Sequence, residues 1–221
     1  MKRLFEPESI ALVGVSRDPE KLSHSLMRNV VEAGSRARIY PVSRSRGPIL
    51  GFPSYPSVRD LPEAPDLVLI SVTSDHVKDS IIEAAEIGAG GAVVLSSGFG
   101  KTRFESGKQL EQELLHIARA AGMRILGPNC LGIYNGRGNL NGTYLVAPVM
   151  HTGNISLVSQ SGAFAGILVN ELNAYGLGLA KFASTGNQLD ISHQEVIEYL
   201  GQDAHTDVIG LIVEEIGRAH V

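Results

Sequence analysis

The stretch Asn154-Ile-Ser-Leu-Val-Ser-Gln-Ser-Gly-Ala163 decides how the rest of the chain is interpreted. Its first half is an apolar run of strand length, and residues 164–174 are apolar at helical spacing. We therefore predict a buried parallel strand, a tight turn at 159–163 and a helix. Small residues leave the first N–H groups of that helix uncovered, and such groups attract anions because they lack intrahelical partners. Two interpretations remain, a phosphate-binding turn or an ordinary serine-capped helix, for Ser159, Gln160, Ser161, Gly162 and Ala163.

The same alternation of apolar runs and helical segments continues on both sides of this stretch. Upstream, we predict strands at 9–15, 38–42, 66–72, 91–95 and 124–126, with helices near 19–33, 77–88 and 104–121. Downstream, we predict a strand at 179–183, a helix at 192–200 and a strand at 208–213. Strands that alternate with helices form right-handed crossovers and a parallel sheet covered on both faces. The predicted fold class is therefore α/β.

A Gly/Asn-rich stretch, residues 134–144, interrupts the alternation before it restarts at Asn154. We therefore place a Rossmann-like, doubly wound domain at residues 1–147 and a second α/β domain at residues 148–221. The last predicted strand is strongly apolar and has no crossover helix to cover it. We expect either a truncated chain or one that needs a partner surface.

Composition limits the class of protein. The chain has 221 residues, of which 43% are hydrophobic, so it can bury a core. Its net charge of −4 argues against a general nucleic-acid binder. Its one cysteine, Cys130, excludes an internal disulfide framework and argues against a Cys-rich zinc site. Because the sequence shows neither a secretory signal nor an apolar run of membrane-spanning length, we expect a cytoplasmic protein with no membrane partner.

Ligands of a doubly wound sheet bind at the carboxyl ends of its strands. The first of these ends lacks the dinucleotide fingerprint, because its three glycine positions hold Gly14, Ser16 and Pro19. The loop after the second strand carries Arg44 and Arg46 where a NAD site would hold a carboxylate. Two arginines suit a phosphate on the ribose, which both NADP and coenzyme A (CoA) carry, although a solvated pair of loop residues explains them equally well.

Two features favour CoA over NADP. Ser16, Arg17 and Lys21 follow Gly14 near the start of the first helix, where a hydroxyl group, cations and backbone amides can share a pyrophosphate. In addition, a simple NADP reductase does not need a second α/β unit with its own anion-type turn. CoA is therefore the preferred cofactor.

Seven motifs, in the right order along the chain, closely resemble those of the NDP-forming acyl-CoA synthetases, which are relatives of the succinyl-CoA synthetase alpha subunit. They are Val13-Gly-Val-Ser-Arg-Asp-Pro19, Ile39-Tyr-Pro-Val-Ser43, Tyr55-Pro-Ser-Val58, Ser97-Gly-Phe99, Gly127-Pro-Asn-Cys-Leu-Gly132, Gly153-Asn-Ile-Ser-Leu-Val-Ser-Gln-Ser-Gly-Ala163 and Thr185-Gly-Asn187. The resemblance implies a CoA-binding domain followed by a flavodoxin-like ligase domain. It also implies an oligomer in which an ATP-grasp subunit or domain binds ATP/ADP and Mg²⁺. A phosphohistidine would carry the phosphoryl group, and a carboxylic acid would pass through an acyl phosphate to the CoA thioester.

The resemblance also implies roles for individual residues. The CoA contacts match Ser16, Arg17 and Lys21 at the pyrophosphate, Pro41 and Ser43 at the second strand, Val72, Thr73, Ser97, Gly98 and Phe99 along the adenosine and pantetheine wall, and Asn129 and Cys130 near the thiol end. Residues 159–163 match the helix N-terminus that receives the phosphohistidine. Glu215 matches the glutamate that pairs with that histidine, so it is the expected catalytic residue of this chain.

The chain departs from the family pattern in two places. Ser45 stands where family members often carry a lysine, so Arg44 or Arg46 must substitute for it. The phosphohistidine of the family lies in a later segment, and we interpret His151 and His220 as surface loop residues. The chain is therefore expected to bind CoA without completing a phosphoryl relay, either as part of a ligase or as a non-catalytic regulatory module.

Two residues that resemble nucleophiles have simpler interpretations. Cys130 has no visible histidine and acid partners, which favours a small buried hydrophobic residue. Ser161 lacks the flanking glycines of a G-x-S-x-G elbow, because positions 159 and 163 hold serine and alanine. The sequence therefore predicts no hydrolase.

Overall fold

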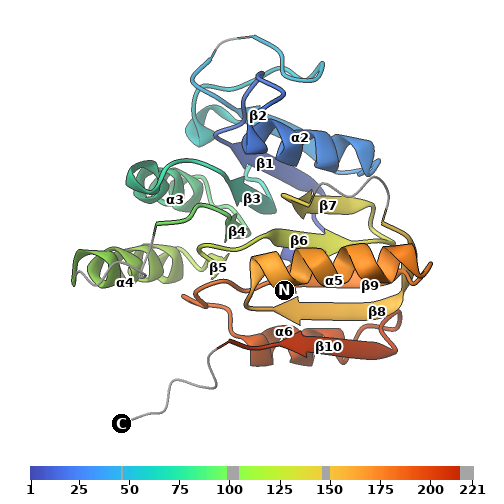
Figure 1. Cartoon of the computed structure of the whole chain (residues 1–221). Helices are drawn as coiled ribbons and strands as arrows, with labels where there is room; N and C mark the ends of the chain where they lie inside the picture. The colour runs from blue at the N-terminus through green and yellow to red at the C-terminus, as the bar shows by residue number, and fades with distance from the viewer. Residues whose placement is uncertain (46, 99–104, 146–149, 215–221) are drawn as a thin grey trace.

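The computed structural model describes residues 1–45, 47–98, 105–145 and 150–214. Its described part contains two five-stranded sheets, with strand orders β2-β1-β3-β4-β5 and β10-β8-β9-β6-β7 (Figure 1). The predicted α/β class is confirmed, and the sequence-based expectations for Arg46, Phe99, Glu215 and His220 lie outside the described residues. Among the described helices, none has the length and apolar character needed to cross a lipid bilayer.

The first sheet is entirely parallel. Its strands are β1 (Ser9–Val13), β2 (Arg38–Val42), β3 (Leu67–Ile70), β4 (Gly91–Val94) and β5 (Arg124–Leu126). Every residue of β1, β3 and β4 is buried, as expected for strands covered on both faces. Pro41 is accommodated because β2 is an edge strand, where a missing N–H donor interrupts no central ladder.

Helices cover the two faces of the first sheet unequally. One face packs on α3 (Val77–Glu86) and α4 (Glu105–Ala120), through a cluster that includes Val68, Ile81 and Leu114. The other face packs on the short α1 (Lys2–Phe5) and on α2 (Leu22–Glu32). This second cluster continues into the second sheet, so the two sheets share one hydrophobic core.

An antiparallel hairpin joins the two sheets, and the sequence analysis did not anticipate it. It consists of β6 (Gly132–Asn135) and β7 (Leu140–Thr143), and β6 pairs with β9 of the second sheet. Gly132 is required where the hairpin begins, because its φ is +115° and a Cβ would lie 2.1 Å from the carbonyl oxygen of Gly142. The hairpin lies within residues 1–147 in sequence, yet its strands hydrogen-bond in the second sheet.

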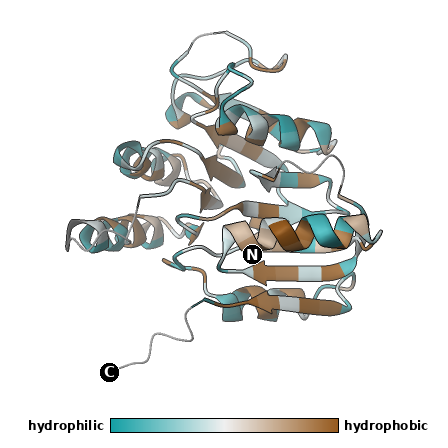
Figure 2. Ribbon diagram, viewed as in Figure 1, coloured by the Kyte–Doolittle hydropathy of each residue, from teal (hydrophilic) through white to brown (hydrophobic). Residues whose placement is uncertain are grey.

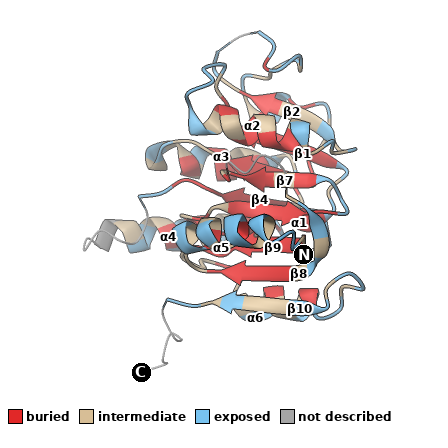
Figure 3. Ribbon diagram, turned by 45° about the vertical axis from the view of Figure 1, so that its right-hand side comes forward, coloured by how far each residue is buried: buried red, intermediate tan, exposed pale blue. Residues whose placement is uncertain are grey.

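The remaining strands of the second sheet are β8 (Thr152–Ser159), β9 (Leu179–Ser184) and β10 (Val208–Ile212), which run parallel to one another. The helix α5 (Gly162–Ala174) lies on one face, and α6 (His193–Leu200) begins with a capping box formed by Ser192 and Glu195. Parts of α5 and β10 are coloured hydrophobic in Figure 2 and exposed in Figure 3, and their exposed apolar residues include Phe164, Ile167, Val208 and Leu211.

The segment after β9 fastens the second sheet to the first. The backbone N–H groups of Asn187, Leu189 and Ile191 donate to carbonyl oxygens of Pro128 (2.9 Å), Gly127 (2.9 Å) and Ile125 (3.1 Å), respectively. The fully buried carboxylate of Asp190 accepts from Arg124 Nε (2.7 Å), the Ile125 N–H (3.0 Å) and Arg119 (3.0 Å). Segment 187–191 therefore follows the free edge of β5 and fixes the orientation of the two sheets.

Candidate functional site

A cavity of about 600 Å³ opens at the carboxyl ends of β1, β2 and β3. It is lined by the ends of these strands, the loops that follow them and one side of α3: Val13, Gly14, Val15, Val42, Ser43, Arg44, Ser45, Pro56, Ser71, Val72, Thr73, His76, Asp79, Ser80 and Glu83. Of the predicted CoA contacts, Gly14, Ser43, Arg44, Val72 and Thr73 meet here. The position agrees with the rule that doubly wound sheets bind ligands outside their carboxyl ends.

The loop after β1 can approach its neighbours closely only because it begins with Gly14. This residue has a φ of +88°, and a Cβ would lie 2.3 Å from the carbonyl oxygen of Ser71. Its N–H donates to the Val42 carbonyl oxygen (3.0 Å), which ties the ends of β1 and β2 together. The floor of the cavity is therefore backbone from three adjacent strands.

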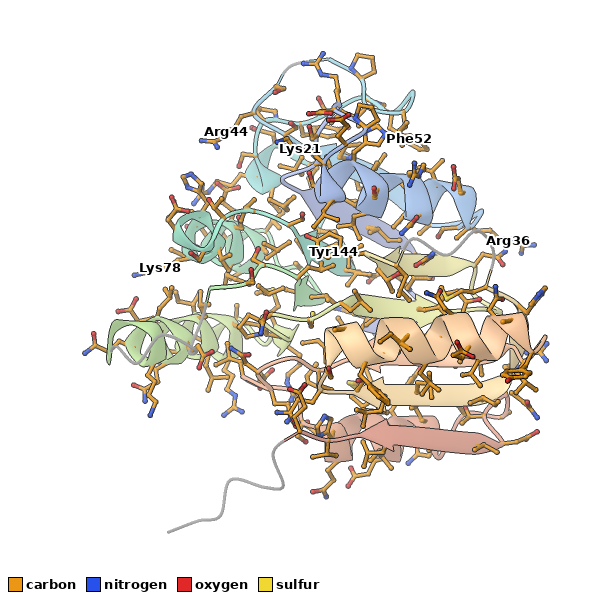
Figure 4. All side chains as sticks on the ribbon, in the orientation of Figure 1. Lys21, Arg36, Arg44, Phe52, Lys78 and Tyr144 are labelled. Carbon is orange, nitrogen blue, oxygen red and sulfur yellow. The ribbon has the colours of Figure 1, made fainter. Side chains whose placement is uncertain are left out.

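The predicted pyrophosphate residues lie beside the cavity and do not line it. Ser16 accepts a hydrogen bond from the Asp18 N–H (3.0 Å), so its hydroxyl group shapes the loop ahead of α2. A guanidinium nitrogen of Arg17 lies 3.2 Å from where Gly47 would carry a Cβ, which brings Arg17 to the β2 loop. Lys21 is the N-cap residue of α2, which begins at Leu22 and not near Pro19 as expected. Figure 4 shows Lys21 and Arg44 at the same end of the molecule.

Arg44 from the loop after β2 and His76, the N-cap residue of α3, both line the cavity. The pKa of Asp75 is lowered mainly by a hydrogen bond from Thr73, with smaller contributions from the positive charges of His76 and Arg44. The sequence analysis missed the α3 wall, which consists of His76, Asp79, Ser80 and Glu83. Asp79, Ser80 and Glu83 follow helical spacing on the face next to buried Val77, Ile81 and Ala84, so the polar positions beside the apolar stripe of α3 could have indicated them.

The predicted pantetheine wall continues from β3 to β4. Ser96 Oγ donates to the Val72 carbonyl oxygen (2.6 Å), and Gly98 lies next to Ser74. The Asn129 N–H donates to the Ser96 carbonyl oxygen (2.9 Å), so the turn after β5 extends the same edge. Pro41, Ser97, Gly98, Asn129 and Cys130 do not line the cavity itself, and their contacts with CoA stay predictions.

The thiol of Cys130 is a packed group. It is 5% exposed and donates to the Val94 carbonyl oxygen (3.3 Å). Burial raises the pKa of this thiol to about 12, so the reactive thiolate is absent at neutral pH. The structure thus supports the packing interpretation of Cys130 over the nucleophile interpretation.

A second candidate site lies at the carboxyl end of the second sheet, in the turn between β8 and α5. Ser159 Oγ donates to the Ser161 carbonyl oxygen (2.7 Å), and Ser161 Oγ accepts from the Phe164 N–H (3.3 Å) as the N-cap of α5. Gln160 Oε1 accepts from the Glu214 N–H (3.0 Å), which turns Gln160 toward the end of β10. A Cβ at Gly162 would make an ordinary van der Waals contact with Leu131 Cβ at 3.5 Å, so this position is not crowded. The serine-cap interpretation therefore describes Ser161, and binding of an anion by the first N–H groups of the helix stays a prediction.

The last residue of β9, Ser184, and the residue after it, Thr185, lie beside Ser159 at the start of this turn. Ser184 pairs with Ser159 in the sheet, and its buried Oγ has no hydrogen-bond partner among the described residues. The N–H and Oγ1 of Thr185 both donate to the Ser159 carbonyl oxygen, at 2.8 and 3.3 Å. Thr185 Oγ1 also lies 2.7 Å from His193 Nε2, and burial lowers the pKa of His193. The largely neutral imidazole of His193 therefore contacts Thr185, which in turn holds the Ser159 carbonyl oxygen.

Comparisons with known proteins find two family matches in succession along the chain. A family model described as a CoA binding domain matches residues 8–136, and a model described as a succinyl-CoA ligase like flavodoxin domain matches residues 152–220. The proposed boundary at 147 and 148 lies between the two matches, and its exact place stays a prediction.

Relatives match nearly the whole chain. An ADP-forming acetate–CoA ligase II subunit alpha from Pyrococcus furiosus is 39% identical, with 96% of this chain and 46% of the relative covered. An ADP-forming acetate–CoA ligase II from Archaeoglobus fulgidus is 35% identical, with 99% and 33% covered. A solved acetyl-coenzyme A synthetase from Candidatus Korarchaeum cryptofilum, in complex with phosphate and ADP, is 34% identical with a TM-score of 0.93, and 99% of this chain and 46% of that chain are covered.

The chain therefore spans about a third to a half of the length of the relatives that it matches. The resemblance to acyl-CoA synthetases is confirmed, and a CoA-binding match over residues 8–136 coincides with the sheet that carries the cavity. This chain belongs to the CoA binding domain family, in the arrangement found in ADP-forming acyl-CoA ligases.

Proposed function

We propose that this chain is the CoA-binding part of an ADP-forming acyl-CoA ligase. The complete enzyme would make an acyl-CoA thioester from a carboxylic acid, CoA and ATP, through acyl phosphate and phosphohistidine intermediates. One observation carries the proposal: a single chain places a ligand-sized cavity at the carboxyl end of a parallel sheet and the N-terminus of α5 at the carboxyl end of β8 in the second sheet. The first suits a nucleotide-like cofactor, and the second suits a phosphoryl group.

The cavity suits the adenosine half of CoA. Small-molecule sites enclose roughly 300–1,000 Å³, a range that includes the cavity's volume of about 600 Å³. Arg44 and Arg46 would bind the 3′-phosphate, while Ser16, Arg17 and Lys21 would bind the pyrophosphate outside the cavity. The pantetheine chain would then follow Val72, Thr73 and residues 97–99 toward Asn129 and Cys130.

The turn at Ser159–Gln160–Ser161–Gly162–Ala163 would receive the phosphoryl group. The dipole of α5 and the uncovered N–H groups of its first turn attract an anion, and the buried Ser184 hydroxyl group lies in the adjacent strand. The Korarchaeum relative was solved with phosphate and ADP, which supports a phosphate site in this family. Glu215 would orient the phosphohistidine.

Nucleotide chemistry would come from elsewhere in the enzyme. Phosphoryl transfer from ATP requires a nucleotide site with Mg²⁺ to neutralise the phosphates, and we propose that an ATP-grasp subunit or domain supplies it. The Pyrococcus relative is an alpha subunit, which supports a partner subunit. In this arrangement, the described chain alone forms no thioester.

Calorimetry with CoA and NADPH tests the proposal. We expect CoA to bind in the micromolar range and NADPH to bind far more weakly, because the second and third fingerprint glycines are replaced by Ser16 and Pro19. Tight binding of NADPH without any heat from CoA would replace the ligase assignment with a reductase.

A further inference from the structure

Glu111 is a buried carboxylate on α4, outside both candidate sites. It is 8% exposed, and its Oε1 accepts a hydrogen bond from Asn187 Nδ2 at 3.0 Å. A carboxylate removed from water is costly unless hydrogen bonds compensate for the lost hydration. A glutamate at this position therefore calls for an explanation beyond packing.

The side-chain amide of Asn187 is held at both ends. Its Nδ2 donates to Glu111, and its Oδ1 accepts from Asn129 Nδ2 at 3.3 Å. An ionised carboxylate only accepts hydrogen bonds, so it can face only the NH₂ end of the amide. Glu111 thus selects the amide orientation that leaves Oδ1 available to Asn129.

The turns that carry Asn129 and Asn187 are interlocked. Gly186 lies so close to the other turn that a Cβ would be 2.1 Å from the Pro128 carbonyl oxygen. The Asn187 N–H donates to that same oxygen at 2.9 Å. Just upstream, Thr185 holds the Ser159 carbonyl oxygen at the start of the phosphate turn. One short segment therefore contacts both the predicted thiol end of CoA and the predicted phosphate site.

We propose that Glu111 is a positioning residue that fixes the spacing between these two sites. Its hydrogen bond to Asn187 holds the turn 185–188 against Pro128 and Asn129, and Thr185 transmits this position to Ser159. The functional meaning rests on the proposed ligase activity, in which an acyl group must pass between a phosphate and a thiol. The local mechanical role does not depend on that activity.

Hydrogen exchange of single amides, measured by NMR on the full chain, tests the mechanical role. Glu111→Ala should accelerate exchange of the Asn187 and Leu189 amides about tenfold or more, since a hydrogen bond to a charged group is lost. Glu111→Gln keeps an acceptor oxygen and should stay within about threefold of the unmodified chain. The amides of Ala180 and Phe182 in β9 should not change. Glu113→Ala is the matched control, because Glu113 lies on the same helix and its side chain is 52% exposed.

Acceleration that spreads equally through β9 would reduce Glu111 to a general stabilising residue, and no acceleration at all would also overturn the proposal. Binding of inorganic phosphate to the same variants tests the functional link. Glu111→Ala should weaken phosphate binding severalfold and Glu111→Gln should restore it. Unchanged phosphate affinity in Glu111→Ala would overturn the positioning role. If the unmodified chain binds no phosphate, the phosphate part of the proposed function fails, and the exchange data still decide the mechanical role.

Discussion

Two strand-to-helix connections, one at the carboxyl edge of each sheet, differ in length. Residues 14–21 lead from β1 to α2, whereas only residues 160–161 lead from β8 to α5. The long connection curls through the Ser16 and Asp18 hydrogen bonds and leaves a wide cavity beside it. The short one delivers a helix N-terminus directly to the strand end. In the described part of the chain, the longer connection therefore lies beside a cavity, and the shorter one places a helix directly after its strand.

Gly14, the first residue of the long connection, and Gly162, the first residue of α5 after the short one, give the largest expected contrast. Gly14→Ala should destabilise the chain by about 3 kcal/mol or more, because a Cβ at a φ of +88° would lie 2.3 Å from Ser71 backbone oxygen. Gly162→Ala should change stability by less than about 1 kcal/mol, because the nearest atom would be 3.5 Å away. Thermal unfolding measures both. Similar losses in the two variants would mean that the connections are equally crowded.

Substitution of Asp190 tests whether its hydrogen bonds hold the two sheets in their relative orientation. Burial alone would raise the pKa of this carboxyl group, but hydrogen bonds from Arg124, the Ile125 N–H and Arg119 lower it overall. A folded-state pKa below the unfolded value stabilises the chain above about pH 4. This contribution is lost as the pH falls through the folded-state pKa. At pH 7, Asp190→Asn should cost about 2 kcal/mol, since both arginines are partly exposed.

Unfolding of Asp190→Asn and of the unmodified chain should be followed from pH 7 to pH 2.5. The stability difference should shrink below about pH 4. Asp207→Asn is the control, because its carboxylate accepts an exposed contact from Asn154. A difference that does not depend on pH would show that Asp190 acts through packing and not through charge.

Substitution of Arg44 tests whether the cavity at the carboxyl end of the first sheet binds CoA. Arg44→Ala should weaken CoA binding about tenfold, because a charge-assisted hydrogen bond contributes about 1.5–3 kcal/mol. Binding of dephospho-CoA, which lacks the 3′-phosphate, should barely change. Arg36→Ala removes the same charge from an exposed position away from Arg44 (Figure 4) and should affect neither ligand. Equal losses for CoA and dephospho-CoA would place Arg44 elsewhere on the cofactor.

Substitutions of the serines in and beside the β8–α5 turn give the smallest expected changes in stability. Ser159→Ala removes the hydrogen bond to the Ser161 carbonyl oxygen and should cost about 1 kcal/mol. Ser184→Ala removes a buried hydroxyl group that has no partner among the described residues, so stability should stay the same or rise slightly. If Ser184→Ala weakens phosphate binding without lowering stability, the hydroxyl group belongs to the anion site. A clear loss of stability would reveal a partner for Ser184 in the folded chain.

Most of the fold was predictable from local pattern. The parallel strands are continuous apolar runs such as Leu67–Ile70, and the helices between them end at glycines. The hairpin β6–β7 was not predictable in this way, because its strands are four residues long and rich in Gly and Asn. Its pairing with β9 joins residues about fifty positions apart, and no local signal encodes such a contact.

The candidate sites were also predictable only where they depend on local sequence. Strand-end reasoning located the cavity and the β8–α5 turn, because parallel strands bring their carboxyl ends to one edge. It missed Glu111 and Asp190, whose roles depend on partners on the other sheet or on α4. The roles of such residues depend on contacts between distant segments, so the local sequence does not indicate them.

The three hydrogen bonds from segment 187–191 to the turn and strand around β5 have a further consequence for how this chain can be divided. A sheet edge with unpaired N–H and C=O groups is a template for pairing with other molecules. A recombinant piece that stops at residue 147 would expose the β5 edge, together with the edge of β6 that pairs with β9. Such a piece should self-associate at concentrations at which the full chain stays dispersed, so the second sheet protects the first from aggregation.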